Sequence, residues 1–398
     1  MTQSHSLCRC LTKWDPQALA DLSGGMRDAE TAGHLFQLDL SDDGISGAEH
    51  PSAIRLNVPT TLVLANLLTS RFKSLPIAVR VPKNRGLSLQ LARGGVFFAL
   101  ANRHNVEWVE GQPHNWNSIA RIWSQPYDPE DKDMYREALV TRRDLTTNAE
   151  AWVVRAAFQR YLLSVIHPHR RPATSLRREL DLIATRWLSG RLNVQIGSEL
   201  ATTLSDWTEV FYEIVVNVPD HASLGARSNA ASLGQLYATL GGGRDSHNRL
   251  HFSVIDNGIG IPARVNKMFP EQPRDPRTAL LDIVNGKLPR REAGRGAGLH
   301  RIRHIANYYS DLSERTKRNS NIWIITNGDH TDRTTTLDWI SEEQDPDTHM
   351  IEDVPVHGTI VWVNLGFERR TEAIDKADQL ELTYAETDEN KLALTGSA

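Results

Sequence analysis

The sequence predicts an α/β protein with more than one domain. Between residues 34 and 110, short apolar runs of strand length alternate with stretches of helical spacing, as in a small α/β domain. Between 190 and 367, alternating runs typical of half-buried antiparallel strands are separated by glycine turns and helical stretches. The 398 residues are enough for two or three domains, each with its own core.

Composition excludes several classes of protein. The net charge of −4 gives no overall attraction to nucleic acid or to an anionic membrane. The two cysteines, Cys8 and Cys10, rule out a disulfide framework, and with His5 they are too closely spaced for a usual structural zinc site. No signal peptide and no run of about 18 apolar residues is visible. We therefore expect a cytoplasmic protein without a membrane span.

Composition shifts and breaks in periodicity divide the chain into five segments. They are a flexible N-terminal segment (1–30), a small α/β domain (31–125), a helical connector (126–189), an α/β domain (190–367) and a disordered tail (368–398). The helical segment is either a plain connector or a dimerisation helix pair. His167 and His169 flank Pro168, so neither is a convincing phosphate acceptor.

In the first α/β domain, apolar runs predict four strands, at 34–40, 53–58, 77–82 and 106–109. Helical spacing predicts helices at 60–72 and 87–103. The stretch "AVRVPKNRGLSLQLARGGVFFAL" resembles STAS-type regulatory domains. No phosphate-binding or catalytic motif is visible there.

The first chemical element is "EIVVNVPDH". Glu213 and Asn217 are four residues apart, so they project from one face of a helix, beside an apolar stripe that includes Trp207 and Ile214. The Asn217 amide oxygen suits Mg²⁺, which takes oxygen ligands. Glu213 suits the orientation or deprotonation of a water molecule. Taken alone, the pair also fits a solvated helix face.

Two glycine-rich elements follow. In "HFSVIDNGIGIP", Asp256 ends a strand and can accept a hydrogen bond from an exocyclic amine such as that of adenine, while Gly258 and Gly260 allow close backbone approach. In "GRGAGLH", a glycine loop opens a helix, and the backbone N–H groups of a helix start bind phosphate well. Arg295 adds a cation there. A hairpin turn and a solvated loop are the plain alternatives.

The order and spacing of these elements, ending with "HGTIVWVNL", resemble the GHKL ATPase superfamily of gyrase, heat-shock chaperone, histidine kinase and MutL-type ATP-binding domains. The resemblance covers about 190–367 and implies a two-layer α/β sandwich, the Bergerat-type fold, with ATP and Mg²⁺ as cofactors. "RTALLDIVNGKLPRREAGRGAGLHRI" is similar to stand-alone bacterial ATPases of this kind, some of them joined to STAS-like domains.

The resemblance also implies roles for individual residues. Glu213 matches the glutamate that activates water, Asn217 the magnesium ligand and Asp256 the adenine-binding aspartate. The remaining matches are the glycines beside the adenine residue, the phosphate-lid glycines and the threonine near the base: Gly258, Gly260, Gly294, Gly296, Gly298 and Thr359.

Three segments gain expectations from the resemblance. Residues 263–293 would form a lid that orders around triphosphate. The acidic insert 328–357 is longer than a hairpin needs, so it is either a partner surface or a solvated loop. Pro219 departs from the family pattern, and it either ends the helix early, moving His221 towards the phosphates, or leaves a site that binds nucleotide and hydrolyses it poorly.

The sequence therefore predicts an Mg²⁺-dependent ATP-binding protein, foremost an ATPase whose nucleotide state switches the lid and partner interactions in bacterial signalling or defence. A protein serine/threonine or histidine kinase is one alternative. A non-hydrolysing adenine-nucleotide sensor or assembly module is another. A protein partner would bind the N-terminal domain, the connector or the acidic insert, a homodimer is a further candidate, and we expect no nucleic acid.

Overall fold

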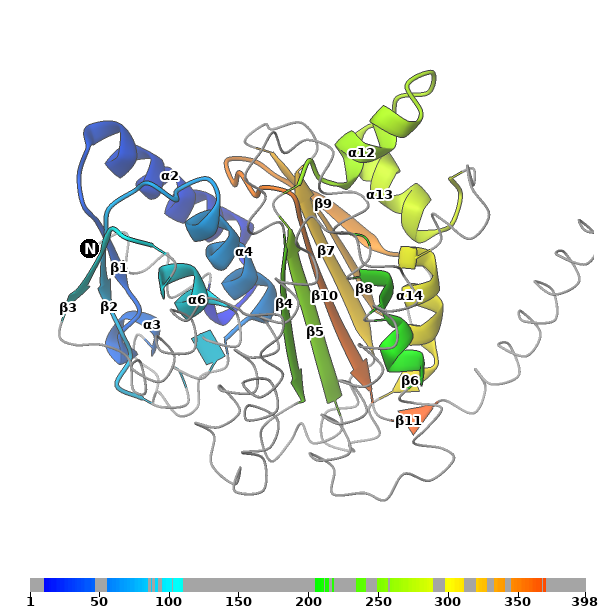
Figure 1. The fold of residues 1–398 in the computed structure, drawn as a ribbon, viewed down its shortest axis with the longest axis horizontal. Helices are drawn as coiled ribbons and strands as arrows, with labels where there is room; N and C mark the ends of the chain where they lie inside the picture. Colours follow the sequence, from blue (N-terminus) through cyan, green and yellow to red (C-terminus); the bar gives the residue numbers. More distant parts are fainter. Residues whose placement is uncertain are drawn as a thin grey trace, which may run out of the picture.

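The structure is a computed structural model, and it has one parallel and one antiparallel sheet with helices, an α/β architecture (Figure 1). The residues that it describes are 11–46, 56–84, 87, 90–91, 95–101, 103–109, 205–210, 212–214, 217, 234–240, 249–256, 258–288, 298–310, 320–327, 333–340, 345–366 and 368–369. The helical connector and most of the C-terminal tail lie outside these residues, as do His5, Cys8 and Cys10.

The N-terminal unit contains a three-stranded parallel sheet, in the order β1-β2-β3. Its strands are β1 (Phe36–Asp39), β2 (Ile77–Arg80) and β3 (Val106–Val109), and its crossing segments contain α3 (Asp42–Ser46), α4 (Val58–Thr69) and α6 (Val96–Ala101). Three of the four predicted strands and the helix predicted at 60–72 are confirmed. Parallel neighbours need crossover connections, which accounts for the alternation of strands and helices.

The strand predicted at 53–58 is wrong in its described part. Asn57 is the N-cap of α4, and its side chain accepts a hydrogen bond from the backbone N–H of Thr60 at 3.0 Å. Pro59 then lies in the first turn, where its missing N–H costs nothing. The helix predicted at 87–103 is interrupted at Gly95, which has a φ of +76°.

The flexible segment predicted at 1–30 is wrong from residue 16 onwards, because α2 (Pro16–Ala32) is a 17-residue helix. Asp15 caps its start by accepting a hydrogen bond from the N–H of Ala18 at 3.0 Å. Gly33, with a φ of +66°, ends it by donating to the carbonyls of Ala29 and Glu30. The pair Asp15-Pro16 and the later Gly33 are the capping signals that could have revealed this helix.

The C-terminal part contains a six-stranded antiparallel sheet in the order β4-β5-β10-β7-β8-β9. Its strands are β4 (Gly234–Leu240), β5 (Arg249–Asp256), β7 (Asn321–Asn327), β8 (Thr334–Ile340), β9 (Asp347–Ile351) and β10 (Thr359–Gly366); β6 (Tyr309–Ser310) and β11 (Glu368–Arg369) form a separate small pair. The predicted strands that became β5, β7 and β10 are confirmed.

The acidic insert 328–357 is not the solvated loop that the sequence allowed. It contributes β8 and β9, which extend the sheet beyond β7, and Leu337 and Trp339 of β8 are buried. The insert is therefore part of the fold, and its use as a partner surface stays a prediction.

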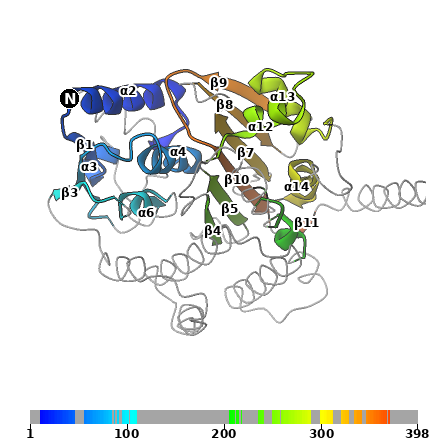
Figure 2. The same cartoon turned by 45° about the horizontal axis from the view of Figure 1, so that its top comes forward.

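The N-terminal unit packs on one face of the antiparallel sheet, so the two parts share a core. Ile255, Ile360 and Ile325 are aligned across β5, β10 and β7, and all three belong to the apolar cluster formed by α2, α4 and the parallel sheet. Trp14 meets Trp323 edge to face, with ring centroids 4.8 Å apart. Figures 1 and 2 show α2 and α4 on this side of the sheet.

Three helices cover the opposite face: α12 (Ile261–Met268), α13 (Pro276–Val284) and α14 (Gly298–Asn307). Successive side chains of a strand point to opposite faces, so the neighbouring row, Val254, Val361 and Ile324, faces these helices. Arg303 of α14 lies over the ring of Trp339 at 5.3 Å. No helix of the described residues has the length and apolarity needed to cross a bilayer.

Candidate functional site

Asp256 ends β5, and its carboxylate organises the turn that follows. Oδ1 accepts hydrogen bonds from the N–H of Gly258 at 2.8 Å and from the N–H of Thr359 at 3.2 Å. The structure thus brings together three residues that the sequence singled out, although Thr359 lies 103 positions further along the chain. Among the described residues none donates to the second oxygen, Oδ2, and the side chain is partly exposed, which leaves an acceptor available.

Two glycines make this arrangement sterically possible. Gly358 has a φ of +73°, and a Cβ there would lie 2.3 Å from the backbone oxygen of Asp256 and 2.4 Å from its Oδ1. Gly260 has a φ of +77°, and a Cβ there would lie 1.8 Å from the backbone oxygen of Asn327. Only glycine fits both the backbone conformation and the space at these positions.

Thr326 is a residue of this site that the sequence reasoning missed. Its hydroxyl accepts from the N–H of Ile261 at 3.0 Å and donates to the carbonyl of Gly358 at 3.1 Å. A hydroxyl has one proton, so the contact of 3.2 Å between the Thr326 and Thr359 hydroxyls is donated by Thr359. Nothing in the strand pattern of 321–327 distinguishes this threonine, because its partners come from other segments.

Burial raises the pKa of Asp256 to about 7, since an ionised carboxylate is poorly solvated there. The hydrogen bonds from Gly258 and Thr359 lower the pKa but only partly offset the effect of burial. The carboxyl group therefore changes charge near neutral pH. A carboxyl of this kind at a strand end is typical of functional sites.

Glu213, Asn217 and Gly298 form a second group. Gly298 is the first residue of α14, and a Cβ there would lie 2.6 Å from Oε2 of Glu213 and 3.5 Å from Nδ2 of Asn217. Glu213 and Asn217 belong to the helical residues 205–210, 212–214 and 217, drawn in green beside α14 in Figure 1. The carboxylate thus lies against a helix N-terminus, where partial positive charge favours anions.

Arg301 and Glu209 extend this second group, and both were missed from the sequence. Nη1 of Arg301 lies 2.8 Å from Oε1 of Glu209 and 3.8 Å from Oε1 of Glu213. Glu209 is buried, one helical turn before Glu213. The spacing of Glu209, Glu213 and Asn217 at intervals of four was a signal that the polar stripe is longer than the predicted pair.

The helical residues around Glu213 are held in place by their buried apolar side chains and by one polar contact. Trp207 and Ile214 of the predicted apolar stripe are buried, as expected. The hydroxyl of Tyr309 donates to Oδ2 of Asp206 at 2.5 Å, and the Tyr309 and Trp207 rings lie 6.3 Å apart. These contacts hold Glu213 and Asn217 towards α14.

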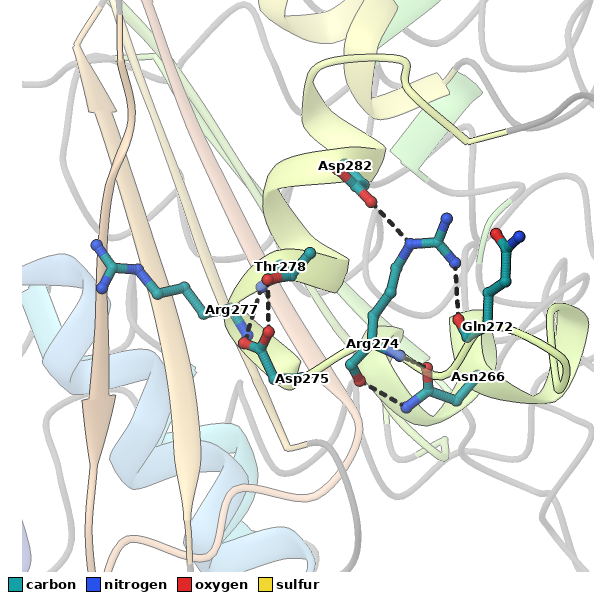
Figure 3. A network of polar contacts seen from close by, with 7 residues as sticks. All are labelled: Asn266, Gln272, Arg274, Asp275, Arg277, Thr278 and Asp282. Atoms are coloured by element: carbon teal, nitrogen blue, oxygen red, sulfur yellow. Dashed lines mark hydrogen bonds and ion pairs between the residues drawn. The ribbon is translucent and has the colours of Figure 1, made fainter.

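Most of the expected lid is already folded by contacts within the chain. Its described part, 263–288, contains most of α12, all of α13 and their connection (Figure 3). Asn266 donates to the carbonyl of Arg274 at 2.9 Å and accepts from its N–H at 2.7 Å, and Nε of Arg274 donates to Asp282 at 2.7 Å. Asp275 caps α13 (Figure 3). Only 289–293 of the expected lid lies outside the described residues.

A histidine pair ties α13 to α14. Nδ1 of His300 donates to the carbonyl of Val284 at 3.1 Å, so its Nε2 accepts from Nε2–H of His304 at 2.9 Å. Gly286 has a φ of +66°, and a Cβ there would lie 3.1 Å from Cδ2 of His300. Burial, followed by electrostatic interactions with His300 and Arg303, lowers the pKa of His304 to about 4.

The Asp256 group and the Glu213 group lie on the same side of the antiparallel sheet, the side that α12–α14 cover. Asp256 is two residues from Val254, so its side chain points to the face covered by α12–α14. By the same alternation Thr326 and Thr359 point there too, and α14 packs on β7 and β10 on that face. Gly294, Arg295 and Gly296 lie outside the described residues, as do Pro219 and His221.

The side-chain atoms available as ligands determine which cation this site could bind. Among the described residues no three His, Cys, Asp or Glu side chains gather as a metal site. Asn217 and Glu213 offer oxygen atoms of the kind that Mg²⁺ takes together with phosphate and water.

A scan against protein-family models, a search of curated proteins and a search of solved structures each found no match to this chain. A function is therefore inferred from the residues and their geometry.

Proposed function

We propose that the chain is an Mg²⁺-dependent ATP-binding protein of the GHKL type, with the sheet and α12–α14 as its two-layer, Bergerat-type sandwich. The observation that carries the proposal is the carboxylate of Asp256, held through one oxygen by Gly258 and Thr359 with the other oxygen available. These are three of the residues that the resemblance assigns to adenine. Thr359 comes from a part of the chain 103 positions after Asp256.

The chemistry of this group suits an adenine ring. The exocyclic amine of adenine donates hydrogen bonds, and an ionised Asp256 accepts them. Gly258 has no side chain that would keep a flat base from the backbone, whereas Gly260 allows the close approach of Asn327 that builds the turn. The Thr359 hydroxyl lies on the same face of the sheet, and its oxygen could still accept a hydrogen bond from a water beside the base.

The group formed by Glu213, Asn217 and Gly298 suits the triphosphate of ATP. The N-terminus of α14 at Gly298 is an anion-binding position, and Arg301 adds a positive charge one turn further on. Asn217 would hold Mg²⁺, which would shield the phosphate charge. Glu213 would orient or deprotonate the attacking water. Hydrolysis of ATP is the turnover that this set of residues supports.

A nucleotide sensor without turnover is the second candidate, and one contact favours it. Oε2 of Glu213 lies against the first residue of α14, the place at which a phosphate oxygen would bind. If this contact persists with nucleotide present, Glu213 is held away from an attacking water. Binding and hydrolysis are therefore tested separately.

For the N-terminal unit we propose a STAS-like regulatory role in the cytoplasm, with a protein partner. The three-stranded parallel sheet with crossing helices supports the resemblance at the level of fold class. The shared core with the antiparallel sheet supports a role that acts on the nucleotide site.

The binding test is calorimetric titration of the full chain with ATP and Mg²⁺. In parallel, γ-labelled ATP is used to measure the release of phosphate and the transfer of label to the protein. We expect Asp256→Asn to weaken ATP binding roughly tenfold or more, because an amide nitrogen would face the adenine amine. Asp347→Asn, an exposed change on β9, is the matched control. Equal affinity of Asp256→Asn and wild type, or no binding by wild type, would overturn the proposal.

The second arm separates hydrolysis from sensing. Loss of phosphate release in Glu213→Gln with retained ATP binding supports an ATPase. Tight binding by wild type without phosphate release or protein label identifies a sensor, and label on the protein identifies a kinase.

A further inference from the structure

Asn66 joins the N-terminal unit to the segment that precedes β10. It lies on α4 with none of its surface exposed. Nδ2 donates to the carbonyl of His357 at 2.8 Å, and Oδ1 accepts from the N–H of His357 at 3.0 Å. The side-chain amide thus pairs with both polar atoms of one backbone residue 291 positions away.

His357, the residue that Asn66 binds, comes directly before Gly358 and Thr359, which contact Asp256. His357 is followed by Gly358, where a Cβ would lie 2.3 Å from the backbone oxygen and 2.4 Å from Oδ1 of Asp256. The carbonyl of Gly358 accepts hydrogen bonds from Thr326 and from the N–H of Asn327. The next N–H, of Thr359, donates to Asp256. A shift of His357 therefore moves a donor of the Asp256 carboxylate.

The chemical surroundings of Asn66 make this contact specific. Its neighbours along α4, from Leu62 to Leu68, are buried apolar side chains, so a leucine at position 66 would match the packing. A buried carboxamide is tolerated only when its polar atoms are bonded. Here both are, because Nδ2 donates to the carbonyl and Oδ1 accepts from the N–H of His357. The amide therefore defines one position of the His357 backbone against α4.

We propose that Asn66 is a positioning residue of the nucleotide site, through which the N-terminal unit sets the affinity of the Asp256 pocket for adenine. The inference rests on the proposed ATP-binding function. Coupling between two parts is reciprocal, so nucleotide bound at Asp256 stabilises the α4–His357 contact, and a partner that moves α4 changes nucleotide affinity.

The variant that tests the proposal is Asn66→Leu, which keeps the volume and removes both hydrogen bonds. We expect ATP to bind roughly tenfold more weakly, because the backbone of His357 loses its two hydrogen bonds to position 66 and the Asp256 donors shift. Arg103→Met is the matched control, since Arg103 is buried in the same unit and holds the carbonyls of Leu68 and Phe72 at the end of α4. It should lower thermal stability and leave ATP affinity unchanged.

A pH profile distinguishes positioning from loss of stability. The Thr359 bond lowers the pKa of Asp256, so loosening it in Asn66→Leu should move the midpoint of adenosine binding to higher pH. Arg103→Met should keep the wild-type midpoint. Equal weakening of ATP binding by both variants, or an unchanged midpoint in Asn66→Leu, would overturn the proposal.

Wild-type protein gives an independent measurement should Asn66→Leu fail to fold. Hydrogen–deuterium exchange with saturating ATP and Mg²⁺ should show slower exchange in peptides that cover α4 and His357. ATP binding without such protection would overturn the role of Asn66 and leave the proposed function standing. Absence of ATP binding in wild type would instead remove the proposed function, and the inference with it.

Discussion

Gly298 and Glu213 lie so close that a side chain at position 298 would displace the glutamate: a Cβ there would be 2.6 Å from Oε2 of Glu213. The contact joins the first residue of α14 to the helical residues around Glu213, which come more than eighty positions earlier. It brings the proposed catalytic base to the proposed phosphate-binding helix start. Since the crowded atom is the end of a flexible side chain, the glutamate can move without unfolding the protein.

Gly298→Ala should therefore separate catalysis from stability. We expect the methyl group to push the Glu213 carboxylate aside and to lower the rate of phosphate release roughly tenfold, with less effect on ATP affinity. Gly24→Ala is the control, because Gly24 lies in α2 with nothing within 4 Å of a Cβ. Phosphate release at the wild-type rate in Gly298→Ala would show that the position of Glu213 does not limit the reaction.

Gly358→Ala should destabilise the protein and weaken ATP binding. The positive φ costs about 1 kcal/mol for alanine, and the clash with Asp256 adds to it, so we expect about 2–4 kcal/mol in urea unfolding. Gly33→Ala provides the comparison, because Gly33 has a φ of +66° and no atom within 4 Å of a Cβ. Equal losses of stability in the two variants would mean that the Asp256 contact relaxes freely.

Adenosine binding should strengthen with rising pH. The pKa of Asp256 is raised to about 7, and the adenine amine needs the ionised, accepting form. Below pH 7 the ligand must displace a proton, so affinity should rise about tenfold between pH 6 and pH 8 and then level off. Adenosine carries no phosphate, so its own charge does not obscure the profile. A flat profile in calorimetric titrations would argue against contact between Asp256 and the base.

His304 should make the protein less stable in mild acid. Its pKa falls from 6.5 to about 4 on folding, so the unfolded chain binds more protons between those values. The contribution of neutral His304 to the free energy of unfolding is fully present above pH 6.5. It is lost as the pH falls through 4. Because the ring is only partly buried, we expect about 1 kcal/mol, measured as a difference between unfolding at pH 7 and pH 4.

The control for His304 is a second histidine in a different environment. His304→Gln should flatten the dependence of unfolding free energy on pH over this window, and His349→Gln, on exposed β9, should leave it as in wild type. An unaltered slope in His304→Gln would assign the acid sensitivity to other groups.

The sequence by itself determined the local elements whose signals are contained in a few neighbouring residues. Alternating apolar runs predicted β1, β2, β3, β5, β7 and β10, and helical spacing predicted α4. The motif spacing also singled out Asp256, Gly258 and Thr359, which the structure brings into hydrogen-bond contact. The capping pattern of Asp15 and Gly33 was equally local, and α2 could have been found from it.

Only the tertiary structure decided which segments meet. The pairing of Asn66 with His357, the bonds of Thr326 and the ion pairs of Arg301 join residues far apart in the chain. Their residue types alone carry no trace of these partners, because a buried amide, hydroxyl or guanidinium is defined by the groups that satisfy it. The placement of the N-terminal unit on the sheet has the same origin. This placement depends on the apolar faces of the helices and strands. Each element would expose its apolar face by itself, and the faces are buried only when the elements pack together.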